Sequence, residues 1–348
     1  MYRGPGGMLA AMESGDEDQL GLALLGEMDT RSGLPRPEWP AVQARWLALP
    51  VEQRAAAWSA VERAWQRRVS EAWAQQGRAY RLWEDGEVLL NTDLPEGEAR
   101  RVVALVQRAL RVIERCLGGL GFREFVEQPA GYNGAGLDVV VICRSADDYR
   151  DYLAETEGLR RGTAEGCGAC LREGSVHVAA HGGSAAALRD TLSHQLAHCR
   201  LAEWELPTWL EEGLVTHLET AVTPSDRYAA DLQTRALHRG FWTPARLGYF
   251  FEGSGFRGSD DAQGLMYHLA HWVFGELMRT DSEAVVEFLR KASWRDAGAG
   301  AAERVLGRSL IQLLPELVRD AATANADLLE HDPPDLDGDP SEFEDPEP

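Results

Sequence analysis

The stretch AALRDTLSHQLAHCRLAEWELPTWLEEGLVTHLE, residues 186–219, decides how this chain is interpreted. Ser184 precedes it as a suitable N-cap for a first helix, and Pro207 separates that helical pattern from a second one. His194 and His198 stand four positions apart on the first helix. Because an α-helix has 3.6 residues per turn, this spacing places both imidazoles on one face, where their nitrogens can occupy neighbouring corners of a metal's coordination shell.

The second helical pattern offers carboxylates. Glu211 and Glu212 directly precede Gly213, and a carboxylate from a neighbouring helix is a usual third ligand beside two histidines. A fourth position would be left to water. The residue types and their spacing therefore predict a zinc site.

The motif HQLAH followed by PTWLEEGLVTHLE resembles the gluzincin, or peptidase MA-like, metallopeptidases, whose pattern is H-E-x-x-H and then W-L-x-E-G. The resemblance implies that His194, His198 and Glu212 are the zinc ligands and that Glu211 fills a variable position. It also implies that the chain binds a peptide or a protein.

The residue after the first histidine departs from this pattern. In the family it is the glutamate that takes a proton from zinc-bound water, whereas here it is Gln195. An amide can hydrogen-bond the water but cannot accept and return its proton at neutral pH. General-base catalysis contributes typically 10²–10⁴-fold, so we expect a metallopeptidase-like protein that is inactive or weakly active and acts in binding.

Two other functions stay open. One is an active zinc-dependent hydrolase or peptidase that uses another base, such as Glu211, Asp190 or a histidine nearer the C-terminus. The other is a metal-free scaffold in which the histidines only pack and other surfaces bind partners.

A second ligand register is also compatible with the sequence, because the separation from His198 to Glu212 is shorter than is usual in the family. If His194 is the second histidine of the motif, Asp190 takes the place of the first and Thr191 the place of the glutamate. Asp190 is also a competent zinc ligand. Both registers keep His194 and Glu212, and neither has a glutamate at the general-base position. We favour His198 because its register needs one substitution rather than two.

Weaker catalytic candidates lie on the apolar pattern GLMYHLAHWVFGEL. Similar family helices pack behind the metal site, so Tyr267, His268 or His271 could stabilise an oxyanion or replace the base. The commoner role of such side chains is packing in a helical core. His217, five positions after Glu212, falls where the family often has tyrosine, which would place it behind the ligands.

The formal net charge of −21 argues against a nucleic-acid partner, because phosphate binding depends on clustered Lys and Arg. No run approaches the roughly 20 apolar residues that cross a bilayer, and residues 1–21 lack the pattern of a signal peptide. We therefore expect no membrane attachment and a cytoplasmic location.

The five cysteines are an odd number scattered through a long chain, which predicts reduced thiols rather than a disulfide framework. Cys167 and Cys170 have C-x-x-C spacing, but no second pair follows at zinc-ribbon distance and no thioredoxin-like pattern surrounds them. We interpret residues 167–170 as a glycine-containing loop.

Four regions are predicted along the chain. Residues 1–38 are glycine-rich and acidic and are predicted to be disordered, residues 39–78 to form a helical region, residues 79–325 a zincin-like domain, and residues 326–348 a disordered acidic tail. The tryptophans of the second region recur at helical spacing and are predicted to be core.

The predicted fold class is α+β. Strand candidates at residues 80–92, 138–143 and 175–180 precede the helix that carries the histidines. From Tyr228 the chain is predicted to be nearly all helical, with one helix over residues 301–322. We expect a small mixed sheet packed on an active-site helix, followed by a mostly helical C-terminal region, as in zincin-like proteins.

Overall fold

The computed structural model describes residues 14–31, 33–120, 136–157, 166–257, 261–279 and 282–326. These residues form two compact units. Unit 1 holds the described residues up to Trp204 together with Leu218–Pro224, and unit 2 holds Glu205–His217 and the described residues from Ser225 onward. Helix α9 (Thr208–Val222) is continuous and contributes residues to both.

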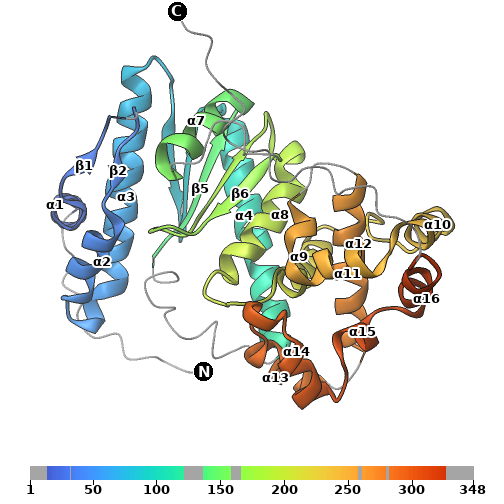
Figure 1. The fold of residues 1–348 in the computed structure, drawn as a ribbon. Coiled ribbons are helices and arrows are strands. Elements are labelled where there is room, and N and C mark those ends of the chain that lie inside the picture. Colours follow the sequence, from blue (N-terminus) through green and yellow to red (C-terminus); the bar gives the residue numbers. More distant parts are fainter. Residues whose placement is uncertain are drawn as a thin grey trace, which may run out of the picture. The chain divides into compact units, whose positions relative to one another are not determined.

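Unit 1 combines helices with a mixed sheet (Figure 1). Its helices are α1 (Ser14–Leu25), α2 (Trp39–Leu47), α3 (Val51–Gln75), α4 (Glu96–Gly119), α7 (Ala146–Glu157) and α8 (Ala185–Arg200). Its strands are β1 (Met28–Asp29), β2 (Arg36–Pro37), β3 (Arg81–Asp85), β4 (Val88–Thr92), β5 (Asp138–Cys143), β6 (Gly168–Leu171) and β7 (His177–His181). The predicted α+β class is confirmed in this unit.

The main sheet has five strands in the order β3-β4-β5-β7-β6, while β1 and β2 form a separate antiparallel pair. Strands β4, β5 and β7 run parallel, and β3 and β6 are antiparallel edge strands. The central strands read as nearly continuous apolar runs because helices cover both faces of the sheet. Helices α3 and α7 pack on one face, and α4 and α8 on the other (Figure 1).

The strand predicted over residues 80–92 is a hairpin of β3 and β4. Gly86 adopts a positive φ of 61° at the two-residue turn, a conformation that glycine adopts without steric cost and that two-residue hairpins require. Gly86 and Glu87 are the two turn residues between the paired Asp85 and Val88, so the chain reverses at Gly86.

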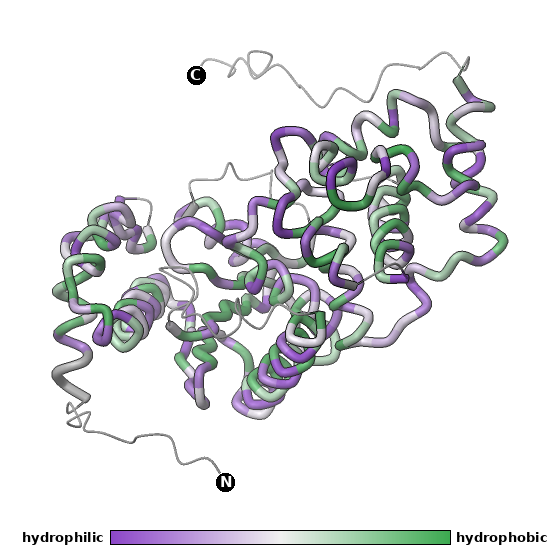
Figure 2. Tube along the Cα trace, turned by 90° about the horizontal axis from the view of Figure 1, so that it is seen from below, coloured by the Kyte–Doolittle hydropathy of each residue, from purple (hydrophilic) through white to green (hydrophobic). Residues whose placement is uncertain are grey.

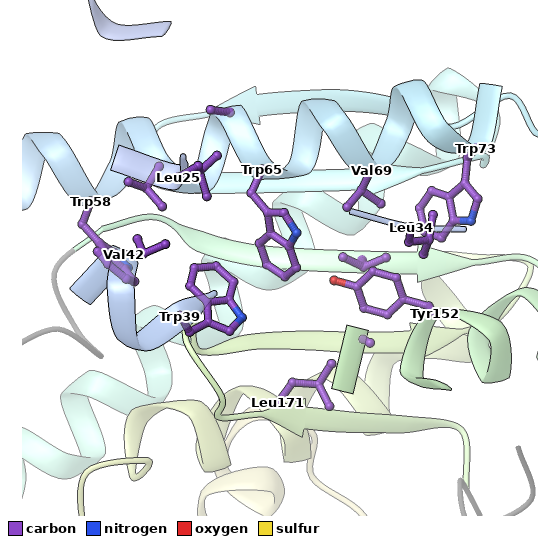
Figure 3. Close-up of a cluster of buried hydrophobic side chains, with 14 of the residues drawn as sticks. Leu25, Leu34, Trp39, Val42, Trp58, Trp65, Val69, Trp73, Tyr152 and Leu171 are labelled. Carbon is purple, nitrogen blue, oxygen red and sulfur yellow. The ribbon is translucent and has the colours of Figure 1, made fainter. Parts of the chain in front are cut away.

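The tryptophans of α3 lie in the core, as predicted. Trp58, Trp65 and Trp73 are each at most 1% exposed, and they face the sheet together with Trp39 of α2 (Figure 3). Trp39 packs edge-on against Trp65, with ring centroids 5.0 Å apart. Figure 2 shows hydrophobic and hydrophilic residues interleaved along the helices, as expected for helices that bury one face.

Part of the segment predicted to be disordered is ordered. Within residues 1–38, Ser14–Leu25 form helix α1, which packs against α3. Leu24, Leu25 and Leu34 are buried in the same core as the tryptophans. The apolar residues at the end of α1 therefore find a partner in tertiary structure, which composition alone does not reveal. The predicted acidic tail lies outside the described residues, except for Ala326.

The predicted domain boundaries also differ from the compact units. Residues 39–78 belong to the same unit as the sheet, because α3 covers one of its faces. The division between the units falls inside the region 79–325 that was predicted to be one domain.

Within the described part of unit 2 the regular elements are all helices, which confirms the prediction of a nearly all-helical region after residue 228. Besides the first part of α9, it contains α10 (Leu232–Phe241), α11 (Pro244–Glu252), η1 (Ser254–Phe256), α12 (Asp261–Leu277), α13 (Ser282–Lys291), η2 (Trp294–Asp296), α14 (Ala299–Ala301), η3 (Ala302–Leu306), α15 (Leu310–Leu313) and α16 (Glu316–Ala324). The prediction of a single helix over residues 301–322 is wrong. Gly307 is left-handed with a φ of 65°, and Pro315 caps the start of α16, so the chain turns twice.

A buried carboxyl group joins α3 to the sheet. Glu62 is 2% exposed and accepts hydrogen bonds from the Leu137 N–H (2.7 Å) and the Ser175 hydroxyl (2.9 Å). Burial raises the pKa of Glu62 to about 8, although both hydrogen bonds act in the opposite direction. Glu62 therefore holds a proton in the folded protein over a pH range in which the unfolded chain has lost it.

This group makes stability depend on pH. Because the folded pKa lies above the ordinary value of 4.5, the free energy of unfolding contributed by Glu62 falls as pH rises from about 4.5 to about 8. In Glu62→Gln this dependence is absent. Urea unfolding measures the free energy of unfolding at pH 5 and at pH 8. Between these pH values it should fall by about 2–4 kcal/mol more in the wild type than in Glu62→Gln. An equal fall in the free energy of unfolding in the two proteins would contradict a raised pKa for Glu62.

Candidate metal centre

Helix α8, which carries the histidines, is fixed at both ends within unit 1. At its start the Ser184 side chain accepts a hydrogen bond from the Ala187 N–H (3.3 Å), which confirms the predicted N-cap. At its end the Arg200 guanidinium donates to the Asp138 carboxylate (2.6 Å) and to Glu114 (3.1 Å). These contacts tie the helix to β5 and α4, so its direction over the sheet is set by residues outside the motif.

The tryptophan and glycine of the W-L-E-E-G segment hold the first part of α9 in unit 2. Trp209 is fully buried and donates from Nε1 to the Ala297 carbonyl (3.0 Å). A Cβ added to Gly213 would lie 2.7 Å from the Ala270 carbonyl oxygen, so only glycine lets α12 approach this closely. Both residues therefore serve helix packing, and the carboxylates between them are presented from a fixed helix.

The last turns of α9 lie against α8 within unit 1. His194 Nδ1 is 3.0 Å from Glu219 Oε2, and the Ser193 and Thr223 hydroxyls are 3.2 Å apart. Glu219 is only 3% exposed. A carboxylate accepts but does not donate, so His194 donates its Nδ1–H and keeps a lone pair on Nε2. Nε2 is the nitrogen that a metal ion would need.

The two predicted histidine ligands face each other. His194 Nε2 and His198 Nε2 are 3.2 Å apart. Two nitrogens bound to one tetrahedral zinc ion at 2.0–2.1 Å stand about 3.3–3.4 Å apart. The spacing of the two imidazoles therefore fits neighbouring corners of such a site.

Glu212 completes the cluster. Ligand atoms of His194, His198 and Glu212 all lie within 4.8 Å of one another, and Glu212 is 8% exposed. Glu212 and Glu219 are seven residues apart on one continuous helix, which places them about 20° apart around its axis. Glu212 and Glu219 therefore lie on the same face of α9. Two imidazoles and one carboxylate form a donor set that suits zinc.

The remaining residues of the motif have different surroundings. Asp190, the ligand of the second register, has a side chain that is 52% exposed and pairs with Arg189 (3.2 Å). The cluster of potential ligands contains His198 in its place, which favours the first register. Gln195 is partly buried on α8, and Glu211 is buried on α9.

The weaker candidates have packing partners in unit 2. Tyr267 lies edge-on to Phe256, with ring centroids 5.3 Å apart. His268 lies among Tyr228, His238 and Trp272. These contacts match the commoner, packing role, and a catalytic role for Tyr267 or His268 stays a prediction.

His217 packs against His271 and Phe274, with ring centroids 5.4 and 5.5 Å apart. Burial lowers the pKa of His217, as it does that of His268. Its imidazole is therefore kept neutral inside the helical core of unit 2.

Sequence reasoning missed Glu219 as the carboxylate behind His194. The available signal was its position seven residues after Glu212, where helical periodicity returns to the same face.

No protein-family model matches the chain, and no curated protein matches it either. Within the described ranges, every helix is too short or too polar to pass through a membrane.

The carboxylate behind His194 should control metal affinity. Outer carboxylates of this kind typically change affinity 10–100-fold when they are removed, so Glu219→Ala should weaken zinc binding by that factor. Competition with a fluorescent zinc chelator measures the zinc affinity of both proteins. Glu203→Gln, which removes an exposed acid just after the end of α8, is the matched control and should bind like the wild type. Wild-type affinity in Glu219→Ala would show that the hydrogen bond does not orient a ligand.

Proposed function

We propose that this chain is a gluzincin-like protein that holds a zinc ion on His194, His198 and Glu212 and uses the site to bind a peptide or protein segment. The observation that carries the proposal is the convergence of these three side chains, with Glu219 orienting His194 from behind. Their combination is typical of a metal-binding histidine.

The donor atoms support zinc as the metal. Neutral imidazole and carboxylate are ligands that zinc accepts in tetrahedral sites with one position left for a further ligand. When bound, zinc would supply a Lewis acid that polarises an oxygen of a bound molecule. The chain's own residues would orient that molecule, and Gln195 could donate a hydrogen bond to it.

The amide of Gln195 supports binding rather than efficient hydrolysis. It cannot remove a proton from water at neutral pH, and Glu211 is buried on the helix that carries Glu212. We therefore favour a binding role over peptidase activity. A carbonyl or carboxylate oxygen of a peptide or protein segment is the group that this site would hold.

Metal analysis tests the site. After loading with zinc and dialysis, the wild type should retain one zinc ion per chain, and His194→Ala and His198→Ala should retain none. Asp190→Asn is the matched control for the second register and should retain zinc like the wild type. Zinc should also raise the melting temperature of the wild type, because it binds the folded state. A chain that retains no zinc, or whose melting temperature is unaffected by zinc and by chelation, would support the metal-free scaffold instead.

Placing a glutamate after the first histidine tests the assigned role of position 195. The substitution Gln195→Glu should create chelator-sensitive cleavage of a peptide library, at a rate about 10²–10⁴-fold above that of the wild type, because a carboxylate can act as the general base. The double variant Gln195→Glu, His194→Ala should be inactive. Chelator-sensitive cleavage by the wild type that persists in Gln195→Ala would instead establish an active hydrolase with another base.

A further inference from the structure

Two thiols meet beside the proposed metal site. Cys170 lies on β6 and Cys199 on α8, and their Sγ atoms are 3.0 Å apart. Both side chains are partly exposed. Cys199 directly follows the ligand His198 in the chain. The cysteine pairing in this region is therefore between a strand and a helix, not within the C-x-x-C motif.

The C-x-x-C spacing does not describe this pair. The loop predicted over residues 167–170 is replaced by strand β6, which begins at Gly168 and pairs with β7. Cys167 precedes this strand, whereas Cys170 lies within it. Cys167 is exposed, whereas Cys170 faces α8 and meets Cys199.

We propose that Cys170 and Cys199 are a redox-sensitive dithiol that a hydroperoxide converts to a disulfide, and that this disulfide weakens metal binding by His198. The second part rests on the proposed function, whereas the first does not. The contact between the two sulfurs carries the inference, because a disulfide needs them to approach by only about 1 Å further.

The oxidation is balanced with hydrogen peroxide as the oxidant. One thiol receives an oxygen atom from the peroxide and becomes a sulfenic acid, while the O–O bond breaks and water leaves. The second thiol then attacks that sulfur, forms the S–S bond and releases a second water. Two electrons pass from the two thiols to the peroxide, and a small dithiol such as dithiothreitol reverses the change by exchange.

The position of the pair explains the expected effect on the metal. Among the residues that the structure describes, β6 is an edge strand whose backbone pairs with β7. The disulfide would draw residue 199 toward this strand, and His198 shares the same helical turn. A small displacement of His198 changes the 3.2 Å spacing between the two imidazoles, on which tetrahedral binding depends.

The first experiment identifies the disulfide. Reduced full-length protein is treated with hydrogen peroxide, its remaining thiols are alkylated, and the digest is analysed by mass spectrometry. We expect a cross-linked Cys170–Cys199 peptide that dithiothreitol removes. Cys170→Ser and Cys199→Ser should each abolish it, whereas Cys167→Ser and Cys116→Ser should leave it intact. A cross-link through Cys167, or oxidation of Cys170 and Cys199 only to sulfinic and sulfonic acids, would overturn the proposal.

The second experiment measures the coupling. Zinc affinity should fall about tenfold or more in the oxidised wild type and should be unchanged by peroxide in Cys170→Ser. Melting curves of the reduced serine variants check that they are folded. Unchanged affinity in the oxidised wild type would refute the coupling. If the reduced protein binds no zinc, the proposed function fails, while the cross-linked peptide still decides whether the dithiol is redox-sensitive.

Discussion

The hydrogen bond from His194 to the buried Glu219 carboxylate is the interaction on which the candidate site depends. It joins α8 to the last turns of α9, and it leaves the Nε2 lone pair of His194 available to a metal. Glu212 lies on the same face of the continuous helix α9 as Glu219. The contact with Glu219 thus sets the tautomer of one candidate ligand, His194.

The residues that make the segment after Pro207 look like a metallopeptidase motif have mostly structural duties. Trp209 anchors α9 through its hydrogen bond to Ala297, and Gly213 permits the close approach of α12. Only Glu212 contributes a donor atom to the cluster. Gln195 stands directly after His194, and its amide cannot move a proton at neutral pH. The proposed site is therefore suited to binding without turnover.

Local signals made much of the site predictable. The Ser184 cap, the four-residue spacing of the histidines and the break at Pro207 each act within a few residues, and α8 and α9 follow from them. Features that depend on distant parts of the chain could not be read in this way. The burial of Leu25 against α3 and the meeting of Cys170 with Cys199 both arise from tertiary packing. Glu219 falls between these cases. Its seven-residue spacing from Glu212 can be read from the sequence, but its contact with His194 cannot.

X-ray absorption at the zinc edge of the zinc-loaded, reduced protein shows whether two imidazoles and one carboxylate share one zinc ion. We expect a first shell of nitrogen and oxygen at about 2.0–2.1 Å with the outer scattering of two imidazoles, and no bound zinc in His198→Ala. Sulfur at about 2.3 Å would place the metal on Cys170 and Cys199 instead. The scattering of only one imidazole in the wild type would exclude His194 and His198 as joint ligands.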